Sequence, residues 1–178
     1  GKYQLNKDKE ALKSYLEDYI EPKMKKFDNL NDRLNYLVEN DYYSKEILDL
    51  YDQYVIDVIY DFIRAKNFKF QSYMSASKFY QNYALKSNDG EEILENYEDK
   101  VLIVALTLGN GEPKLAKDIA EKLINQEFQP ATPTFLNAGR ARGGKMVSCF
   151  LVNVEDSCEG ISYAVSSANH LSKIGGGV

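Results

Sequence analysis

The sequence has few of the residues on which self-contained catalytic and metal sites are usually built. Its 178 residues include two cysteines, Cys149 and Cys158, one histidine, His170, and no tryptophan. Two cysteines and one histidine are too few for an ordinary structural zinc site, and they give little support for a secreted fold held by disulfides. A Ser-His-Asp or Cys-His enzyme would have to use His170, which we interpret as a non-catalytic helix residue.

Further absences restrict the class of protein. No apolar run approaches the roughly 18 residues of a membrane helix, and the opening GKYQLNKDKE lacks the pattern of a signal peptide. The 22 basic and 27 acidic residues give a net charge of −5 without any basic stretch, which argues against a nucleic-acid-binding surface. Glycine-rich nucleotide motifs of the G-x-G-x-x-G and Walker A types are also missing. We therefore expect a cytoplasmic protein in a reducing setting.

The chain divides into two regions of different composition. Residues 1–127 hold most of the charge and most of the 14 tyrosines, and apolar residues recur there at helical spacing. Residues 128–178 are rich in Thr, Pro, Gly and Ser. The prediction is a helical domain over 1–127, followed over 128–178 by the beginning of an α/β layer.

Helix signals recur along the first region. We expect a first helix from an N-cap at Asn6 to Pro22 and a second after an N-cap at Asn31. Ser44 begins a third, and an apolar stripe at helical spacing follows over 54–63. Further helices are expected over 73–86, over 92–108 and after Pro113. The run VLIVALTLG at 101–109 is apolar on all sides, so its helix should be buried all round. The residues of the helix after Pro113 that are expected to face the core are Leu115, Ile119, Ala120, Leu123 and Ile124.

The second region combines turns, a strand and a helix. Pro130 and Pro133 disfavour a helix at Ala131 and Thr132. The run MVSCFLVNV at 146–154 is apolar and predicts a buried strand. Glu155-Asp156-Ser157 then offers an N-cap for a helix over 160–173 that runs into glycines 175–177. Such an unfinished layer would leave a strand edge unpaired, so we expect a longer parent chain.

Cys149 admits two interpretations. A single cysteine in an apolar strand is commonly a small buried core residue. The alternative is a redox thiol at a strand end, with a partner outside this sequence. The spacing to Cys158 is not of the C-x-x-C type, so a pair between the two cysteines is possible but unsupported.

The polar residues of the second region also have two interpretations each. Hydroxyls that could help to hold a phosphate come from Thr132, Thr134 and Ser148, and backbone N–H groups from glycines 175–177. Taken singly, these are more often turn or cap residues. Asp156 and Ser157 either cap the following helix or, with the helix N-terminus, bind a sugar hydroxyl and a phosphate.

One family matches these residues. The stretch QPATPTFLNAGRARGGKMVSCFLVNVEDS, residues 129–157, resembles the large catalytic subunit of ribonucleotide reductase in its class Ib form. Shorter matches to the same subunit are MSASKFY at 74–80, YALK at 83–86, YEDKV at 97–101 and LSKIGGGV at 171–178. The resemblance therefore spans nearly the whole chain. It implies a mainly α fold, in which a helical N-terminal domain precedes the first strand-helix segment of a ten-stranded α/β barrel.

The resemblance also implies an activity. The parent enzyme would reduce ribonucleoside diphosphates to 2′-deoxyribonucleoside diphosphates by radical chemistry, with a cysteine pair as reductant. A metal-containing small subunit would supply the radical, and a glutaredoxin- or thioredoxin-like protein would restore the thiols. The chain itself would bind no metal or resident cofactor, would form a homodimer, and would respond to ATP and deoxynucleotide effectors.

Roles for individual residues follow from the resemblance alone. Cys149 is implied to be one of two redox-active thiols, with its partner on a later barrel strand beyond this sequence. Substrate contacts are implied for Thr132, Ser148, Cys149 and Gly177. Effector contacts are implied for Asp156, Ser157 and Cys158, with the Asp156 carboxylate accepting a ribose hydroxyl.

Other family features are missing from the sequence. These are the thiyl-radical cysteine with its neighbouring Asn and Glu, the radical-relay tyrosines and the C-terminal thiol pair, so this stretch alone is expected to be inactive. The complete ATP-cone domain of longer relatives is also missing, which fits class Ib. Two alternatives remain open: an adenosylcobalamin-dependent reductase of the same superfamily, and a non-catalytic helical interaction module that binds no nucleotide.

Overall fold

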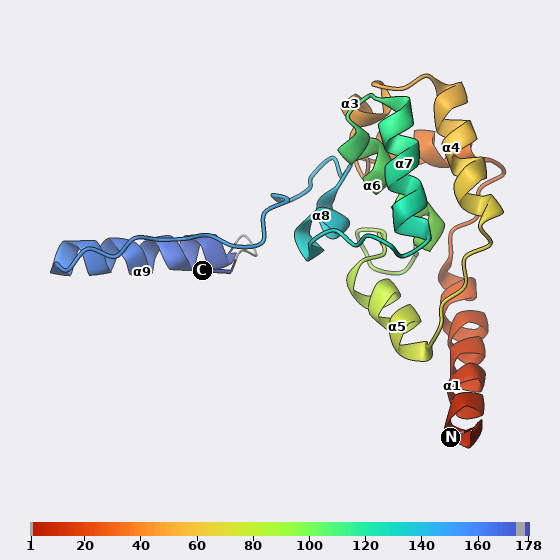
Figure 1. Ribbon diagram of the computed structural model, residues 1–178, viewed down its shortest axis with the longest axis horizontal. Coiled ribbons are helices and arrows are strands. Elements are labelled where there is room, and N and C mark those ends of the chain that lie inside the picture. The colour runs from red at the N-terminus through yellow and green to blue at the C-terminus, as the bar shows by residue number, and fades with distance from the viewer. Residues whose placement is uncertain (1, 174–176) are drawn as a thin grey trace.

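The computed structural model describes residues 2–173 and 177–178, and over these ranges the chain is mainly helical (Figure 1). The α-helices in chain order are α1 Lys2–Ser14, α2 Leu30–Glu39, α3 Lys45–Leu48, α4 Gln53–Ala65, α5 Tyr73–Asn82, α6 Tyr97–Gly109, α7 Pro113–Ile124, α8 Thr132–Asn137 and α9 Cys158–Lys173. After α1 the chain continues as a π-helical segment, Tyr15–Ile20, and a 3₁₀ turn, Glu21–Lys23. The predicted mainly α fold is confirmed, while the barrel segment is not visible as such.

Helix α6 forms the centre of the helical body and packs against both α7 and α4, which also contact each other. Figure 1 shows these three helices together. The residues of α6 from Val101 to Leu106 are all buried, which confirms the all-round burial predicted from their apolar run. Gly109 lets α7 approach closely, because a Cβ at this position would lie 2.6 Å from the Cβ of Ala116. Burial of these side chains removes apolar surface from water and is the main stabilising contribution here.

Several predicted helix starts were wrong. Asn6 lies inside α1, and Asn31 lies inside α2, whose N-cap is Asn29 with its Oδ1 accepting the Asp32 backbone N–H at 2.8 Å. Helix α6 begins at Tyr97, five residues later than predicted, because a capping box fixes its first turn. The start after Ser44 and the first turn at Pro113 are confirmed.

Two predictions about packing and proline were also wrong. Leu115 is 42% exposed, and Ala116 takes the core position in its place. The other predicted core residues of α7 are confirmed, since Ala120, Leu123 and Ile124 are buried and Ile119 packs against the core. Thr132 begins α8 even though Pro133 follows it. The proline sits in the first helical turn, where its missing N–H is not needed by the helix.

Gly139, just after α8, lets the chain pack closely against α6. Gly139 has φ 71°, and a Cβ there would lie 2.3 Å from Cγ1 of Ile103 in α6. Residues on either side of Arg140 pair with the segment after α2, since Ser44 N–H donates to the Gly139 carbonyl at 2.8 Å. A side chain at position 139 would therefore push α8 away from α6.

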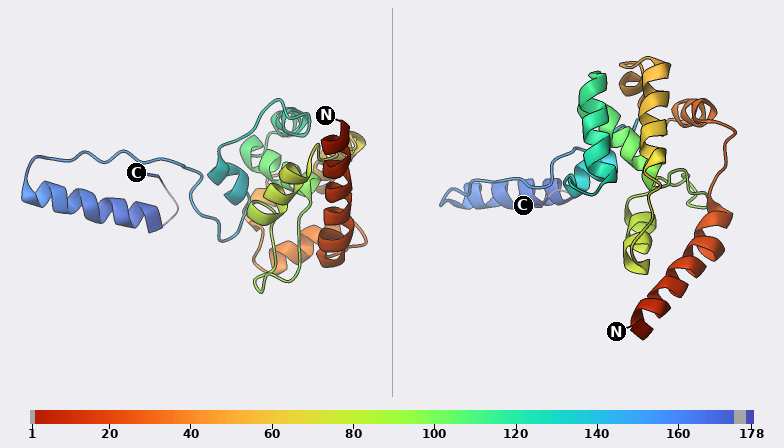
Figure 2. Two further views of the ribbon diagram at one scale, coloured as in Figure 1. Left: turned by 90° about the horizontal axis from the view of Figure 1, so that it is seen from below. Right: turned by 45° about the vertical axis from the view of Figure 1, so that its right-hand side comes forward.

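The last part of the chain leaves the helical body. Residues 144–157 run outward in an extended path and α9 returns beside them, as the views of Figures 1 and 2 agree. The strand predicted over 146–154 is not formed: in the described ranges this segment makes one isolated bridge, from Cys149 to Gly177. A strand needs a neighbour along its whole length to pair its backbone groups, and in the described part of the chain the backbone of this segment pairs with Gly177 alone. Its predicted burial is wrong as well, since Leu151 is fully exposed.

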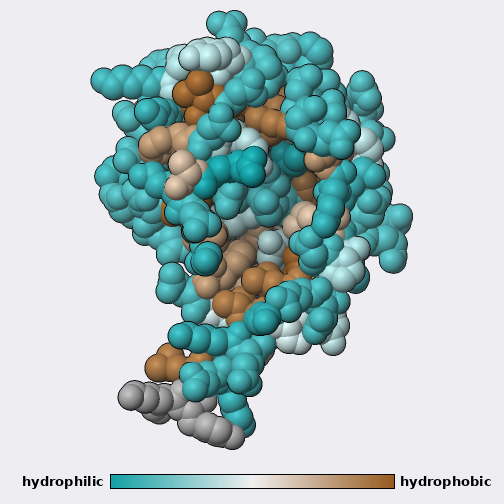
Figure 3. Space-filling model, turned by 90° about the vertical axis from the view of Figure 1, so that its right-hand side faces the viewer, coloured by the Kyte–Doolittle hydropathy of each residue, from teal (hydrophilic) through white to brown (hydrophobic). Residues whose placement is uncertain are grey.

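The surface seen from the side of α1 and α4 is mainly hydrophilic, with hydrophobic side chains gathered in a hollow (Figure 3). A pocket of about 510 Å³ lies between α1 and residues 68–70. None of the helices in the described part of the chain has the length and apolar character needed to cross a membrane.

Replacing Leu106 by alanine is expected to lower the free energy of unfolding by about 2–5 kcal/mol, because the shorter side chain would leave a cavity among the buried residues packed around α6. Leu115→Ala is the matched control, and its effect should stay within about 0.5 kcal/mol since this leucine is on the surface. Urea denaturation measures both changes. Equal losses in the two variants would contradict this description of the core.

Candidate functional site

Three of the four residues predicted to contact substrate lie together. The Gly177 N–H donates to the Ser148 carbonyl at 2.8 Å, and the Gly177 carbonyl accepts from the Phe150 N–H at 2.8 Å. A Cβ on Gly177 would lie 3.9 Å from the Cys149 sulfur. The structure thus brings Ser148, Cys149 and Gly177 into one exposed group, while glycines 175 and 176 lie outside the described residues.

Thr132 lies at the start of α8, exposed, with its Oγ1 3.3 Å from the Tyr83 hydroxyl. The same helix holds the segment that leads to Ser148: Thr134 donates to the Met146 carbonyl at 3.3 Å, and Asn137 donates to the Lys145 carbonyl at 3.3 Å. Helix α8 therefore connects Thr132 with the group around Ser148. That all four residues form one substrate site stays a prediction.

The predicted effector residues lie at the far end of α9. The Ser157 hydroxyl accepts the Gly160 N–H at 2.9 Å, which confirms its predicted role as a helix cap. Asp156 and Cys158 are exposed on either side of it. The length of α9 separates this group from Gly177, which lies near the other end of the helix (Figure 1).

Both cysteines are free and exposed, so the interpretation of Cys149 as a buried core residue does not fit this structure. The two thiols are not paired with each other: Cys149 lies within the extended segment, and Cys158 is the first residue of α9. Exposed His170 lies with its Nδ1 3.3 Å from the Ser166 carbonyl, one turn back in α9. Across the described ranges, no three His, Cys, Asp or Glu residues gather in a way that could hold a metal ion.

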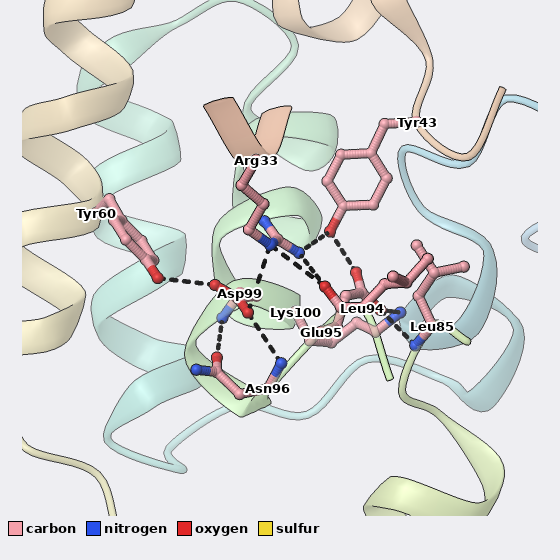
Figure 4. A network of polar contacts seen from close by, with 9 residues as sticks. All are labelled: Arg33, Tyr43, Tyr60, Leu85, Leu94, Glu95, Asn96, Asp99 and Lys100. Atoms are coloured by element: carbon pink, nitrogen blue, oxygen red, sulfur yellow. Dashed lines mark hydrogen bonds and ion pairs between the residues drawn. The ribbon is translucent and has the colours of Figure 1, made fainter. Parts of the chain in front are cut away.

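The structure also contains a buried cluster of titratable residues that was not predicted from the sequence. Four charged side chains are buried around the start of α6: Arg33, Glu95, Asp99 and Lys100 (Figure 4). The Lys100 ammonium lies 2.8 Å from Glu95 Oε1, and both side chains are fully buried. The same Oε1 accepts the Leu85 backbone N–H at 2.8 Å.

The other half of this buried cluster centres on Arg33 and Asp99 (Figure 4). Arg33 donates through Nη2 to the Leu94 carbonyl at 2.9 Å, and its Nε lies 3.6 Å from Asp99 Oδ2. Asp99 accepts from the Tyr60 hydroxyl at 2.7 Å and from the Asn96 N–H at 2.9 Å. Tyr43 joins the two halves, because its hydroxyl accepts from Arg33 and donates to Glu95.

Burial and charge act in opposite directions on Glu95. Burial alone raises the pKa of its carboxyl, but the positive charges of Lys100, Arg140 and Arg33 outweigh it and hold the pKa below the ordinary value of 4.5. Burial lowers the pKa of Lys100, with Glu95 opposing that effect. Because these groups are closed off from solvent, we interpret the cluster as structural. The capping-box spacing of Asn96 and Asp99 is the one local sequence signal beside this cluster, and it locates Asp99 without indicating its distant partners.

Comparison with known proteins identifies the family. Two family models match successive parts of the chain: ribonucleotide reductase N-terminal over residues 1–68, and ribonucleotide reductase, all-alpha domain, over residues 69–143. The ribonucleoside-diphosphate reductase subunit alpha of Bacillus subtilis (strain 168) is 53% identical over all 178 residues. The subunit alpha of Mycoplasma genitalium is 42% identical over 171 residues, or 96% of this chain. The chain belongs to the ribonucleotide reductase large-subunit family.

The match covers this chain much more completely than it covers the relatives. The chain spans about a quarter of the length of the relatives from Bacillus subtilis and Mycoplasma genitalium, 25% and 24% respectively. The two reductase models meet between residues 68 and 69, in the connection from α4 to α5, and the second extends through α8. The division predicted at residue 127 remains a prediction.

The buried cluster yields a test on Glu95. Replacing Glu95 by glutamine should lower the free energy of unfolding at neutral pH by about 3–5 kcal/mol, because the buried Lys100 loses its partner. The folded-state pKa of Glu95 is depressed, so its contribution is present above pH 4.5 and is lost as the pH falls below that value. The variant should therefore show a shallower loss of stability in acid.

Urea denaturation at neutral and acid pH measures both effects. Glu91→Gln, at an exposed carboxylate, serves as the matched control and should behave like the wild type. Parallel acid-induced losses in the wild type and in Glu95→Gln would show that Glu95 does not carry this pH dependence.

Proposed function

We propose that this chain is the N-terminal part of a ribonucleoside-diphosphate reductase, which converts ribonucleoside diphosphates to 2′-deoxyribonucleoside diphosphates. The observation that carries the proposal is the exposed thiol of Cys149 beside Gly177, in a chain that matches a subunit alpha over its whole length. The parent enzyme acts by radical chemistry with a cysteine pair as reductant. This part of it is inactive alone.

Cys149 supplies one of the two thiols in this proposal. When two thiols form a disulfide, they release two electrons and two protons. These are what the substrate requires, because the 2′-hydroxyl leaves as water and a hydrogen takes its place. The second thiol lies in a part of the parent outside this chain, and a glutaredoxin- or thioredoxin-like protein reduces the disulfide again. An exposed Cys149 is accessible to both partners.

The substrate is held by Thr132, Ser148 and Gly177 in addition to Cys149. The hydroxyls of Thr132 and Ser148 suit the phosphate and sugar oxygens of a ribonucleoside diphosphate. The pairing of Gly177 with Ser148 keeps the extended segment around Cys149 close to Gly177. Without a side chain, Gly177 leaves room for a ligand beside the thiol.

ATP or a deoxynucleotide binds as an effector at Asp156, Ser157 and Cys158. Because the Ser157 hydroxyl already caps α9, the exposed Asp156 carboxylate remains to accept a ribose hydroxyl. Helix α9 also exposes Ile161, Tyr163 and Val165, and a second copy of the subunit covers such apolar side chains in the proposed homodimer. A metal-containing small subunit supplies the radical, and the enzyme is cytoplasmic and of class Ib.

The relatives favour this function over the two alternatives. They are named subunit alpha, which suits an enzyme assembled from different subunits rather than an adenosylcobalamin-dependent reductase. Membership of a reductase family argues against a non-catalytic helical module. Dependence of the parent enzyme on added adenosylcobalamin would favour the first alternative.

Cys149→Ser in the full-length parent should abolish multiple-turnover reduction while leaving effector binding unchanged, because only the thiol is lost and the proposed effector residues lie at the far end of α9. The assay supplies the small subunit and a dithiol reductant and measures deoxynucleotide formed. Cys158→Ser removes the other exposed thiol, which the proposal places at the effector site without a redox role, so this variant should still continue past the first turnover. Equal activity of Cys149→Ser and the wild type would remove Cys149 from the reaction.

Asp156→Ala should weaken effector binding by about tenfold, as expected when a charge-assisted hydrogen bond is lost. Calorimetric titration of the full-length parent with a deoxynucleoside triphosphate measures this affinity. Glu155→Ala removes the neighbouring exposed carboxylate and should leave the affinity unchanged. If both variants bind the effector like the wild type, the assignment of Asp156 is wrong.

A further inference from the structure

Tyr83 touches α8 at three points. Its hydroxyl lies 3.3 Å from Thr132 Oγ1, and its ring packs edge-on against that of Phe135 with centroids 5.3 Å apart. Its carbonyl accepts a hydrogen bond from Arg140 Nη2 at 3.3 Å, just beyond the end of the helix. Tyr83 itself is held at the end of α5, where its N–H donates to the Phe79 carbonyl at 2.9 Å. Tyr83 thus contacts the first residue of α8, a buried residue within it, and Arg140, three residues after its end.

From this geometry we infer that Tyr83 is a positioning residue, which orients the Thr132 hydroxyl toward a phosphate oxygen of the ribonucleoside diphosphate. The inference rests on the proposed function, in which Thr132 contacts the substrate, and it adds a residue from the helical body to that site. Tyr83 comes from α5, far from Thr132 in the sequence, and none of the motifs around Thr132 includes it.

The direction of the hydrogen bond follows from the chemistry of the two hydroxyls. A phenol is a better proton donor than an aliphatic alcohol, so Tyr83 donates and Thr132 Oγ1 accepts. The Thr132 proton is then available for another acceptor. An anionic phosphate oxygen is the strongest acceptor that a nucleoside diphosphate offers. Without the tyrosine hydroxyl, the side chain of exposed Thr132 would be free to rotate among its staggered rotamers.

The surroundings keep Tyr83 in place while Thr132 stays accessible. The tyrosine is half-buried and lines a pocket of about 380 Å³ with Phe79, Tyr97 and Phe135. Packing of its ring restricts where the hydroxyl can lie, whereas Thr132 remains exposed to an incoming ligand. Substitution of Tyr83 by phenylalanine keeps the ring and the backbone carbonyl and removes only the hydroxyl.

The test uses the full-length parent with its small subunit and reductant, and compares Tyr83→Phe, Thr132→Val and the double variant. We expect Tyr83→Phe to raise the KM for the ribonucleoside diphosphate by about three- to tenfold, the size of one ordinary hydrogen bond. Its kcat should change little. Because Tyr83 acts through Thr132, adding Tyr83→Phe to Thr132→Val should raise KM no further.

Tyr42→Phe is the matched control, since Tyr42 is also half-buried and its hydroxyl accepts the Asn88 N–H at 3.1 Å, while its backbone contact with Ala141 is kept. It should leave KM and kcat unchanged. Thermal unfolding of each variant verifies that the fold is kept, so that a rise in KM reports on the site.

The outcomes separate this inference from the proposed function. An unchanged KM in Tyr83→Phe, or an independent additional rise in the double variant, would overturn the positioning role and leave the reductase assignment intact. An unchanged KM in Thr132→Val would also overturn it, because Thr132 would then not contact the substrate. A wild-type parent that forms no deoxynucleotide would instead overturn the proposed function itself.

Discussion

The ion pair between Lys100 and Glu95 at the start of α6 is the interaction on which the arrangement of the other helices depends. Glu95 forms the ion pair with Lys100. Its carboxylate also accepts hydrogen bonds from the backbone N–H of Leu85, which follows α5, and from the hydroxyl of Tyr43, which follows α2. The segment of Tyr43 pairs in turn with residues around Arg140, at the end of α8. The position of α8 is therefore linked to the same buried charges.

This cluster fixes where α6 lies more than it adds net stability. Taking charges out of water is costly, so buried ion pairs contribute little compared with apolar residues of the same size. The apolar part of α6 is buried all round, and such a helix can be packed in several rotations about its axis. Lys100, Asp99 and Arg33 find their partners in only one of them, so the polar groups select a single arrangement.

The sequence was a good guide where local patterns decide the structure. The apolar run of α6, the first turn of α7 at Pro113 and the cap of α9 at Ser157 are all local, and all were predicted. The strand over 146–154 was wrong because a strand exists only when a neighbour pairs with it. The contact of Tyr83 with Thr132 and the buried cluster join residues far apart in the sequence, so no local pattern revealed them. At the candidate site, the resemblance to a reductase family led to Cys149 and Gly177, and the structure brought them together.

The most direct test of the central claim is the redox state of Cys149 after one round of reduction. The full-length parent with its small subunit, fully reduced and then freed of external reductant, is given a ribonucleoside diphosphate. The reaction is quenched in acid within the first turnover, before other thiols of the parent can exchange with the new disulfide. Mass spectrometry then measures how much Cys149 has become disulfide-bonded, and this amount is compared with the deoxynucleotide formed. The account predicts one disulfide containing Cys149 for each deoxynucleotide of the first turnover. Deoxynucleotide formed while Cys149 remains a free thiol would contradict it.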